Sequence, residues 1–216
     1  METKINEEEK EPTVSLNVAI LPDEVVWDQA IELSQMLSSR FPTEFTLNKN
    51  DKFPHISIYQ ARFPKRNLAS IQDAVRKLSS TVQPITLRLN DVTIDYDTFI
   101  WWNADKTPEL LSLQREVIER INPMREGMLA PTLATLTNVP LEEQESIRMY
   151  GYANVGASRY RPHITITRAK RPQDATEMLK ALGKRSATFR TTGIIVGYLG
   201  DHGIVSGIVE EFPILK

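Results

Sequence analysis

The sequence contains no cysteine among its 216 residues. Disulfides, thiolate nucleophiles and cysteine-based zinc sites are therefore excluded, and we expect a cytoplasmic location. It also lacks any apolar run of the roughly 18 residues that a membrane-spanning helix needs, so we expect no membrane association. The opening stretch, METKINEEEKEP, has no apolar segment typical of a signal peptide.

A strong excess of basic charge is missing as well. The first twelve residues hold five Glu and two Lys, and the other 204 residues carry 24 basic and 23 acidic side chains. This balance does not favour a protein that binds long duplexes. We expect residues 1–12 to form a disordered acidic tail and residues 13–216 to form a single bilobal domain.

Strand-like and helix-like segments are mixed along the chain. We predict strands at 13–21, 55–60, 85–95, 98–104 and 163–169, and two or three strands over 188–200 and 203–215. We predict helices at 22–41, 67–80, 107–122, 141–155 and 173–183, with Asn67 and Thr107 as N-caps of the second and third. Residues 123–140 are expected to form a loop with one short helical turn. Helices inserted among hairpin-connected strands indicate an α+β fold.

A pentapeptide occurs twice in nearly the same form. PHISI at residues 54–58 returns as PHITI at residues 162–166, and the two copies hold two of the three histidines. The third, His202, is expected to be an exposed residue of a hairpin turn. Each copy is followed by a helix and two strands, so the chain reads as two related lobes that each offer one histidine strand.

Side chains alternate between the two faces of a strand. Each pentapeptide therefore places an imidazole and a hydroxyl on one face, opposite its isoleucines. On the first strand this face is predicted to hold His55, Ser57 and Tyr59. On the second strand it is predicted to hold His163, Thr165 and Thr167.

Two such strands facing each other would surround a phosphate with two imidazoles and two hydroxyls. One neutral histidine could take a proton from an attacking water, and one charged histidine could protonate the leaving oxygen. Such groups contribute about 10²–10⁴-fold each. Neither strand offers a carboxylate beside its histidine, so we expect no metal and no other cofactor.

At these residues the sequence resembles the 2H phosphoesterase superfamily, which includes the bacterial 2′-5′ RNA ligase-like proteins and the cyclic phosphodiesterases. The resemblance rests on HISI at 55–58 and HITI at 163–166. It implies a pseudo-twofold α+β fold in which two antiparallel sheets line a central basic cleft, with helices outside. It also implies that His55 and His163 are the acid–base pair and that Ser57 and Thr165 hold the phosphate.

The function that the sequence favours is a metal-independent phosphodiesterase that acts on a cyclic nucleotide or on an RNA-terminal 2′,3′-cyclic phosphate. A 2′-5′ RNA ligase, an RNA end-processing enzyme and a nuclease for 2′-5′ oligonucleotides are alternatives within the family. A non-catalytic nucleotide- or RNA-binding module is the alternative of another class. The expected partner is a nucleotide or RNA end, and the expected state is a monomer.

Further substrate contacts are predicted around the two motifs. Basic residues gather at 61–66 and 159–171, which favours anion binding. The candidates are Tyr59, Arg161, Arg168 and Trp102. Adjacent Trp101 and Trp102 point to opposite faces, so one is expected in the core and the other is free to stack on a base, and Trp102 is the one we name. Tyr150 and Tyr152 are alternatives for this stacking role.

Overall fold

The structure is a computed structural model that describes residues 11–134, 136, 139–156 and 158–214. Residues 1–10, which make up most of the expected acidic tail, lie outside them. The strands are β1 (Thr13–Ile20), β2 (Ile56–Pro64), β3 (Thr86–Asp95), β4 (Phe99–Ala104), β5 (His163–Arg168), β6 (Ala187–Arg190), β7 (Gly193–Leu199) and β8 (Val205–Pro213). The α-helices are α1 (Glu24–Ser38), α2 (Leu68–Ser79), α3 (Pro108–Ile121), α4 (Pro131–Ala134), α5 (Leu141–Tyr150) and α6 (Pro172–Leu182). Short 3₁₀ turns are η1 (Lys65–Asn67), η2 (Asn122–Arg125) and η3 (Asp201–Gly203).

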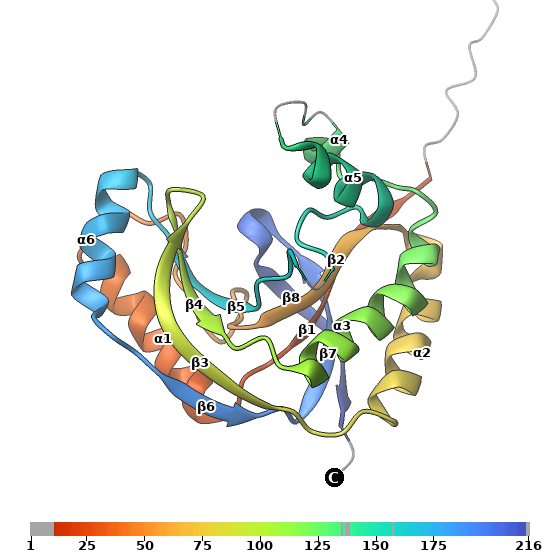
Figure 1. The fold of residues 1–216 in the computed structure, drawn as a ribbon, viewed down its shortest axis with the longest axis horizontal. Helices are drawn as coiled ribbons and strands as arrows, with labels where there is room; N and C mark the ends of the chain where they lie inside the picture. Colours follow the sequence, from red (N-terminus) through yellow and green to blue (C-terminus); the bar gives the residue numbers. More distant parts are fainter. Residues whose placement is uncertain (1–10, 135, 137–138, 157, 215–216) are drawn as a thin grey trace, which may run out of the picture.

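The strands form one antiparallel sheet in the order β6-β3-β4-β5-β2-β1-β7-β8. This corrects the expectation of two sheets. The two halves of the sheet meet between β2 and β5, where a single residue pair, Ile56 with Ile164, continues the ladder. The halves curve away from this junction (Figure 1), and the sheet stays continuous because that one pair is formed.

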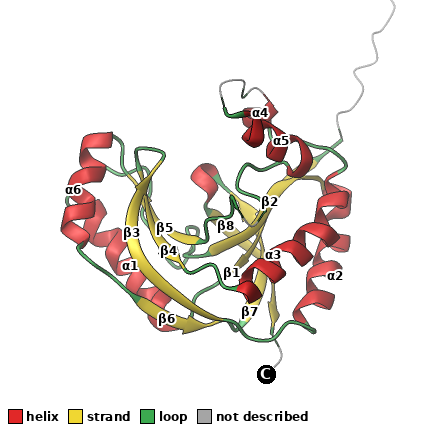
Figure 2. Cartoon of the chain, in the orientation of Figure 1, coloured by secondary structure: helices red, strands yellow, loops and turns green. Residues whose placement is uncertain are grey.

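The expected pseudo-twofold relationship is visible in the strand order. β5, β4, β3 and β6 of one half correspond to β2, β1, β7 and β8 of the other, read outward from the junction. Helices α1 and α6 cover the half that contains β5, and α2 and α3 cover the half that contains β2 (Figure 2). Because α1 follows β1 and α3 follows β4, each connection crosses from one half to the other.

Local sequence signals explain where the longer helices begin. The Asp23 carboxylate accepts a hydrogen bond from the backbone of Val26 at 2.9 Å and caps α1. The Thr107 hydroxyl does the same for α3, which confirms the predicted cap. Asn67 directly precedes α2 but makes no side-chain cap; it donates instead to the Met124 carbonyl at 2.8 Å.

The isoleucines of the repeated pentapeptide form part of the main core. Ile56, Ile58, Ile164 and Ile166 are each at most 2% exposed and pack in one cluster with the covering helices. Burial of a side chain of this size stabilises the fold by about 1.5–3 kcal/mol. In the described part of the chain, no helix combines the length and apolar character needed to cross a membrane.

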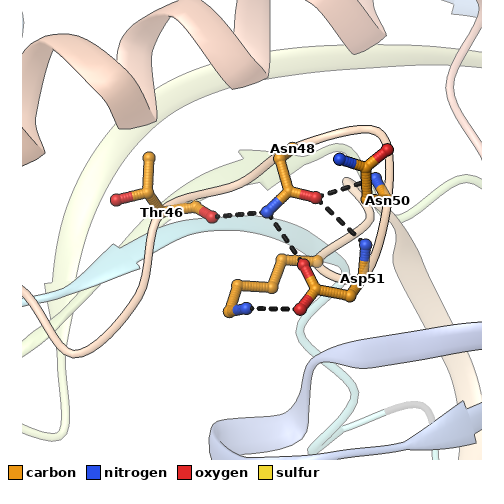
Figure 3. Close-up of polar contacts among 5 residues, drawn as sticks. Thr46, Asn48, Asn50 and Asp51 are labelled. Atoms are coloured by element: carbon orange, nitrogen blue, oxygen red, sulfur yellow. Dashed lines mark hydrogen bonds and ion pairs between the residues drawn. The ribbon is translucent and has the colours of Figure 1, made fainter.

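The loop from α1 to β2 is shaped by one asparagine side chain. The Asn48 carbonyl oxygen accepts from the backbone N–H groups of Asn50 and Asp51, at 2.7 and 3.0 Å. Its amide nitrogen donates to the Asp51 carboxylate at 3.0 Å and to the Thr46 carbonyl (Figure 3). These bonds fix the tight turn that immediately precedes the first histidine motif.

Candidate functional site

The two repeated histidines lie side by side at the junction of the sheet. His55 directly precedes Ile56 and His163 directly precedes Ile164, and these two isoleucines form the pair that joins β2 to β5. The two imidazoles line the same pocket, which has a volume of about 440 Å³. The two copies of the repeated pentapeptide therefore lie next to each other in the fold.

Each imidazole is held by its Nδ1 atom in the same way. His55 Nδ1 lies 2.8 Å from the Phe53 carbonyl oxygen, and His163 Nδ1 lies 2.6 Å from the Arg161 carbonyl oxygen. A carbonyl oxygen only accepts, so Nδ1 carries a proton in both rings. Nε2 is consequently the nitrogen that can take or give a proton in the pocket.

Burial lowers the pKa of both rings. For His55, desolvation outweighs hydrogen bonds to the backbone of Phe53 and Gly203, which act in the opposite direction. For His163, desolvation outweighs the bond to the Arg161 carbonyl, and repulsion from a protonated His55 and from the Arg161 charge acts in the same direction as desolvation, so that the pKa falls to about 3. Both imidazoles are thus neutral at pH 7 without ligand, and each Nε2 offers a lone pair.

The hydroxyls of Ser57 and Thr165 line the same pocket. Ser57 Oγ accepts a hydrogen bond of 2.8 Å from the amide of Asn17, a fully buried residue of β1. Because that bond occupies an acceptor site of the hydroxyl, its proton is directed to another partner. The Ser57 backbone is also fixed, since Tyr160 donates to its carbonyl at 2.9 Å.

A β-bulge changes which side chains of β2 face the pocket. β2 pairs Tyr59 with Val18 but Ser57 with Ala19, so Ile58 is the extra residue. Simple alternation fails beyond this point, and Tyr59 turns away from the pocket. Gln60, three residues after Ser57, lines the pocket in its place.

Tyr59 is therefore a core residue, which corrects its prediction as a substrate contact. It is 1% exposed, and its hydroxyl lies 2.9 Å from Asn122 Oδ1 and 2.7 Å from the Tyr150 carbonyl oxygen, two acceptors that share its one proton. Burial also raises its pKa, so the phenol stays a donor. Its role is to fasten β2 to the segment after α3.

The second strand carries the same irregularity at the same place. β4 pairs Ile100 with Thr167 and Trp101 with Thr165, so Ile166 is the extra residue. Thr167, expected on the pocket face, is instead fully buried and donates to the Phe45 carbonyl at 2.6 Å. The two copies of the pentapeptide therefore share a β-bulge as well as their sequence.

The aromatic residue at the site is Trp101. Its ring stacks on the His163 imidazole with 3.6 Å between centroids and 12° between planes. Trp102, predicted as the contact, is 2% exposed in the core and donates to the Asn90 carbonyl at 3.0 Å. The reason is the register, since Trp101 lies opposite Thr165 whereas Trp102 lies opposite the core residue Ile164.

The two predicted arginines surround the pocket but have protein partners. Arg161 forms a two-point ion pair with Asp95 and lies over the Trp101 ring at 4.9 Å. Arg168 donates to Thr98 Oγ1 at 3.1 Å and to a ring nitrogen of His202 at 2.9 Å. Among the described residues that line the pocket, none is Lys or Arg, which corrects the expectation of a basic cleft.

The outer wall of the pocket is largely apolar. It is built from the α4–α5 region, the β3–β4 turn and the segment after α5, with Leu133, Val139, Ile147, Tyr96, Phe99 and Tyr152 among its members. Burial raises the pKa of Tyr152 to about 12, so its hydroxyl is protonated at neutral pH. Tyr152 was one of two tyrosines considered for a stacking role, and it does line the pocket.

Two further observations complete the site. His202, expected as an exposed hairpin residue, lines the pocket together with His55 and His163. No sequence signal marked it, because its turn lies far along the chain from both motifs. Within the described residues, no group of three or more His, Asp or Glu side chains is arranged to hold a metal ion.

Comparisons with known proteins identify the family and the fold. The model of the 2'-5' RNA ligase superfamily matches residues 22–201. No curated protein matches the chain significantly. Among solved structures, the TT0787 protein of Thermus thermophilus superposes with a TM-score of 0.60 at 15% identity, covering 93% of this chain and 97% of the other. E. coli LigT complexed with 3'-AMP gives a TM-score of 0.54 at 14% identity, covering 95% and 100%.

A protein solved as a phosphoesterase gives a TM-score of 0.53 at 12% identity, covering 95% of this chain and all of the other. These identities are low, so the structural likeness supports the fold.

Proposed function

The chain belongs to the 2'-5' RNA ligase superfamily, and we propose that it is a metal-independent phosphodiesterase of the 2H type. The observation that carries the proposal is the pair of imidazoles, each fixed through Nδ1 to a carbonyl oxygen, with Nε2 available in one shared pocket. A phosphoesterase or ligase-like activity follows from the family, and the cyclic phosphodiesterase activity is our proposal.

The proposed reaction is hydrolysis of a nucleoside 2′,3′-cyclic phosphate. The Nε2 atom of one neutral histidine takes a proton from water, and the water oxygen forms a new bond to phosphorus. The bond from phosphorus to one ribose oxygen breaks, and the Nε2–H of the other, protonated histidine gives its proton to that oxygen. The product is a nucleoside phosphate monoester, and the histidine pair is restored by one proton exchange.

Binding of the substrate anion lets one imidazole take from the solvent the proton that this reaction needs. Both imidazoles have lowered pKa values in the empty site. A phosphodiester anion placed between them favours the charged form of one ring and so raises its pKa. Ser57 and Thr165, whose hydroxyls face the same pocket, are proposed to hold the non-bridging phosphate oxygens.

The pocket supports a small substrate rather than a long RNA strand. Its volume of about 440 Å³ lies in the range of pockets that hold one small molecule. The apolar outer wall suits a nucleobase, and the described residues of the lining include no Lys or Arg that would follow a polyphosphate backbone. A terminal nucleotide of an RNA chain would fit if the rest of the chain remained outside.

The ligase and end-processing alternatives remain as second candidates because the matching family model is that of a ligase superfamily. The cytoplasmic location and the monomeric state stay predictions.

The test is a substrate panel with product identification by mass. It includes nucleoside 2′,3′-cyclic phosphates, cyclic dinucleotides, 2′-5′ oligonucleotides and RNA with cyclic-phosphate ends. We expect cleavage of the 2′,3′-cyclic phosphates in the presence of EDTA and a loss of at least about 10²-fold in His55→Gln and in His163→Gln. Full activity in either variant with a normal unfolding curve would sink the two-histidine mechanism.

A further inference from the structure

The third histidine stands on an unusual backbone. His202 lies in the η3 turn with φ 60° and ψ 18°, in the left-handed region. Few residues other than glycine adopt it, and it costs free energy that the surrounding structure must offset. Gly203 follows with a positive φ as well. The turn therefore presents an imidazole at a position where glycine or asparagine would be easier to accommodate.

The His202 ring is held from several sides. Arg168 donates to its Nδ1 atom at 2.9 Å. Phe45 stacks on the ring at 6.1 Å between centroids and 20° between planes, and Phe99 meets it edge-on at 6.4 Å. Arg168 and Phe99 belong to the half of the sheet that contains β5, whereas the turn belongs to the other half. The ring is thus oriented by residues from across the junction.

The arginine also sets the tautomer of the ring. A guanidinium has only donors, so His202 Nδ1 must accept. The ring proton of the neutral imidazole then sits on Nε2. His55 and His163 have the opposite tautomer, with the proton on Nδ1. The pocket therefore contains two neutral rings with a lone pair at Nε2 and one ring with a proton at Nε2.

The turn also touches the first motif. Gly203 and His202 both line the pocket together with His55. The described residues give His202 Nε2 no hydrogen-bond partner. A fixed donor without a partner, beside a site for an oxygen-rich ligand, is suited to bind a ligand oxygen.

We propose that His202 is a substrate-binding residue of this site, which donates a hydrogen bond from Nε2 to an oxygen of the bound nucleotide. The proposal deepens the proposed function and rests on it. Arg168 is a positioning residue, because it fixes the ring and the proton that the ring offers. The ligand oxygen belongs either to the phosphate or to the ribose, and the two probes of the experiment distinguish these sources.

The first experiment measures binding, so that it does not depend on turnover. Titration calorimetry follows inorganic phosphate and adenosine 3′-monophosphate on the wild type and on His202→Gly. Glycine accepts the backbone conformation and removes the ring. We expect affinity for the nucleotide to fall about tenfold. An equal loss for phosphate assigns the bond to the phosphate, and unchanged phosphate affinity assigns it to the ribose.

Matched variants separate a ligand contact from a structural effect. Asp201→Ala changes the exposed neighbour in the same turn and should bind like the wild type. His202→Asn tolerates a positive φ and keeps a side-chain donor, so it should lose less affinity than His202→Gly. All three should unfold at the wild-type denaturant concentration or above, because none removes a fully buried side chain.

A second measurement reads the tautomer directly. Long-range ¹H–¹⁵N spectra of the histidine rings should show the proton of His202 on Nε2 in the wild type. In Arg168→Met the ring should become a mixture of tautomers, with a smaller loss of nucleotide affinity than in His202→Gly. A wild-type spectrum with the His202 proton on Nδ1 would contradict the proposal.

The outcomes distinguish this inference from the proposed function. If His202→Gly binds both probes as the wild type does, the inference falls even when the two-histidine hydrolysis is confirmed. If the substrate panel shows no hydrolysis but His202→Gly loses nucleotide affinity, the enzyme assignment falls and the binding role stands. A wild type that binds neither probe overturns the inference.

Discussion

Trp101 lies flat beneath His163, with 3.6 Å between the ring centroids and an angle of 12° between the planes. In the other half of the sheet the matching strand position is Ala19, which lies opposite Ser57 as Trp101 lies opposite Thr165. His55 therefore has no ring at the matching position. The two halves are related in backbone but differ in how they support their histidines.

The indole should matter for turnover. Stacking fixes the ring plane, and an aromatic face stabilises an imidazolium above it by cation–π attraction. We expect Trp101→Leu to lower kcat up to about tenfold with a small change in KM, and Trp101→Phe to retain most of the wild-type rate. Steady-state kinetics on a 2′,3′-cyclic phosphate decides this, and kcat within twofold of wild type in Trp101→Leu would contradict it.

Asn17 should act through Ser57. Its amide donates to Ser57 Oγ at 2.8 Å, and the asparagine itself is absent from the pocket lining. We expect Ser57→Ala and Asn17→Ala each to lower kcat/KM, and the double variant to be no worse than Ser57→Ala. A double-mutant cycle on kcat/KM measures this coupling. Additive losses would show that Asn17 acts independently of Ser57.

Stability should fall in acid because His163 is held neutral. Its pKa drops from 6.5 to about 3 in the folded chain, so between these values the unfolded chain binds more protons. The free energy of unfolding therefore increases with pH across this window. The contribution of His163 to stability is lost as the pH falls from 6.5 toward 3. Urea unfolding at pH 7, 5 and 4 should show a weaker pH dependence in His163→Gln. If the free energy of unfolding depends on pH equally in the wild type and in His163→Gln, this prediction is wrong.

Tyr59 should contribute to stability and not to activity. Removal of its hydroxyl in Tyr59→Phe leaves the oxygens of Asn122 and Tyr150 without this donor in a mostly buried place. We expect the free energy of unfolding to decrease by about 1–3 kcal/mol, measured by urea denaturation. The kcat/KM of the folded variant should match that of the wild type, and a selective loss of activity would restore Tyr59 as a substrate contact.

The predicted strand segment at 188–200 forms two strands, β6 and β7, which lie in opposite halves of the sheet. The sequence did predict the longer helices, the other strands and the place of the two histidines. Those predictions succeeded because they depend on local signals: the apolar periodicity of α1, the Thr107 cap, and the repeated pentapeptide. Ser57 and Thr165 face the pocket as expected, since they lie before either bulge.

The errors begin at the bulges. One extra residue at Ile58 and one at Ile166 reverse the faces of everything that follows, which moved Tyr59 and Thr167 into the core. Both bulges depend on pairing with a neighbouring strand, so two-residue alternation cannot reveal them. The choice between Trp101 and Trp102 failed for a related reason, since it required the register of β4 against β5.

His202 was missed because its position is set by the fold. Its neighbours in the chain predict only a turn, and its ring reaches the site through contacts with Phe45, Phe99 and Arg168 from distant segments. Its positive φ is the one local feature, and a positive φ at this residue cannot be predicted from the tripeptide sequence Asp-His-Gly. Residues that act across a sheet junction are the part of a site that periodicity does not reveal.

The single pair Ile56–Ile164 has a mechanical consequence for the molecule. A hinge displaces each point in proportion to its distance from the axis, and the two histidines sit one residue from this pair. Tilting of one half against the other would swing β6 and β8 through long arcs and shift the two imidazoles very little. Such a tilt would widen the rim of the pocket and leave the spacing of the two proton-transfer groups nearly constant.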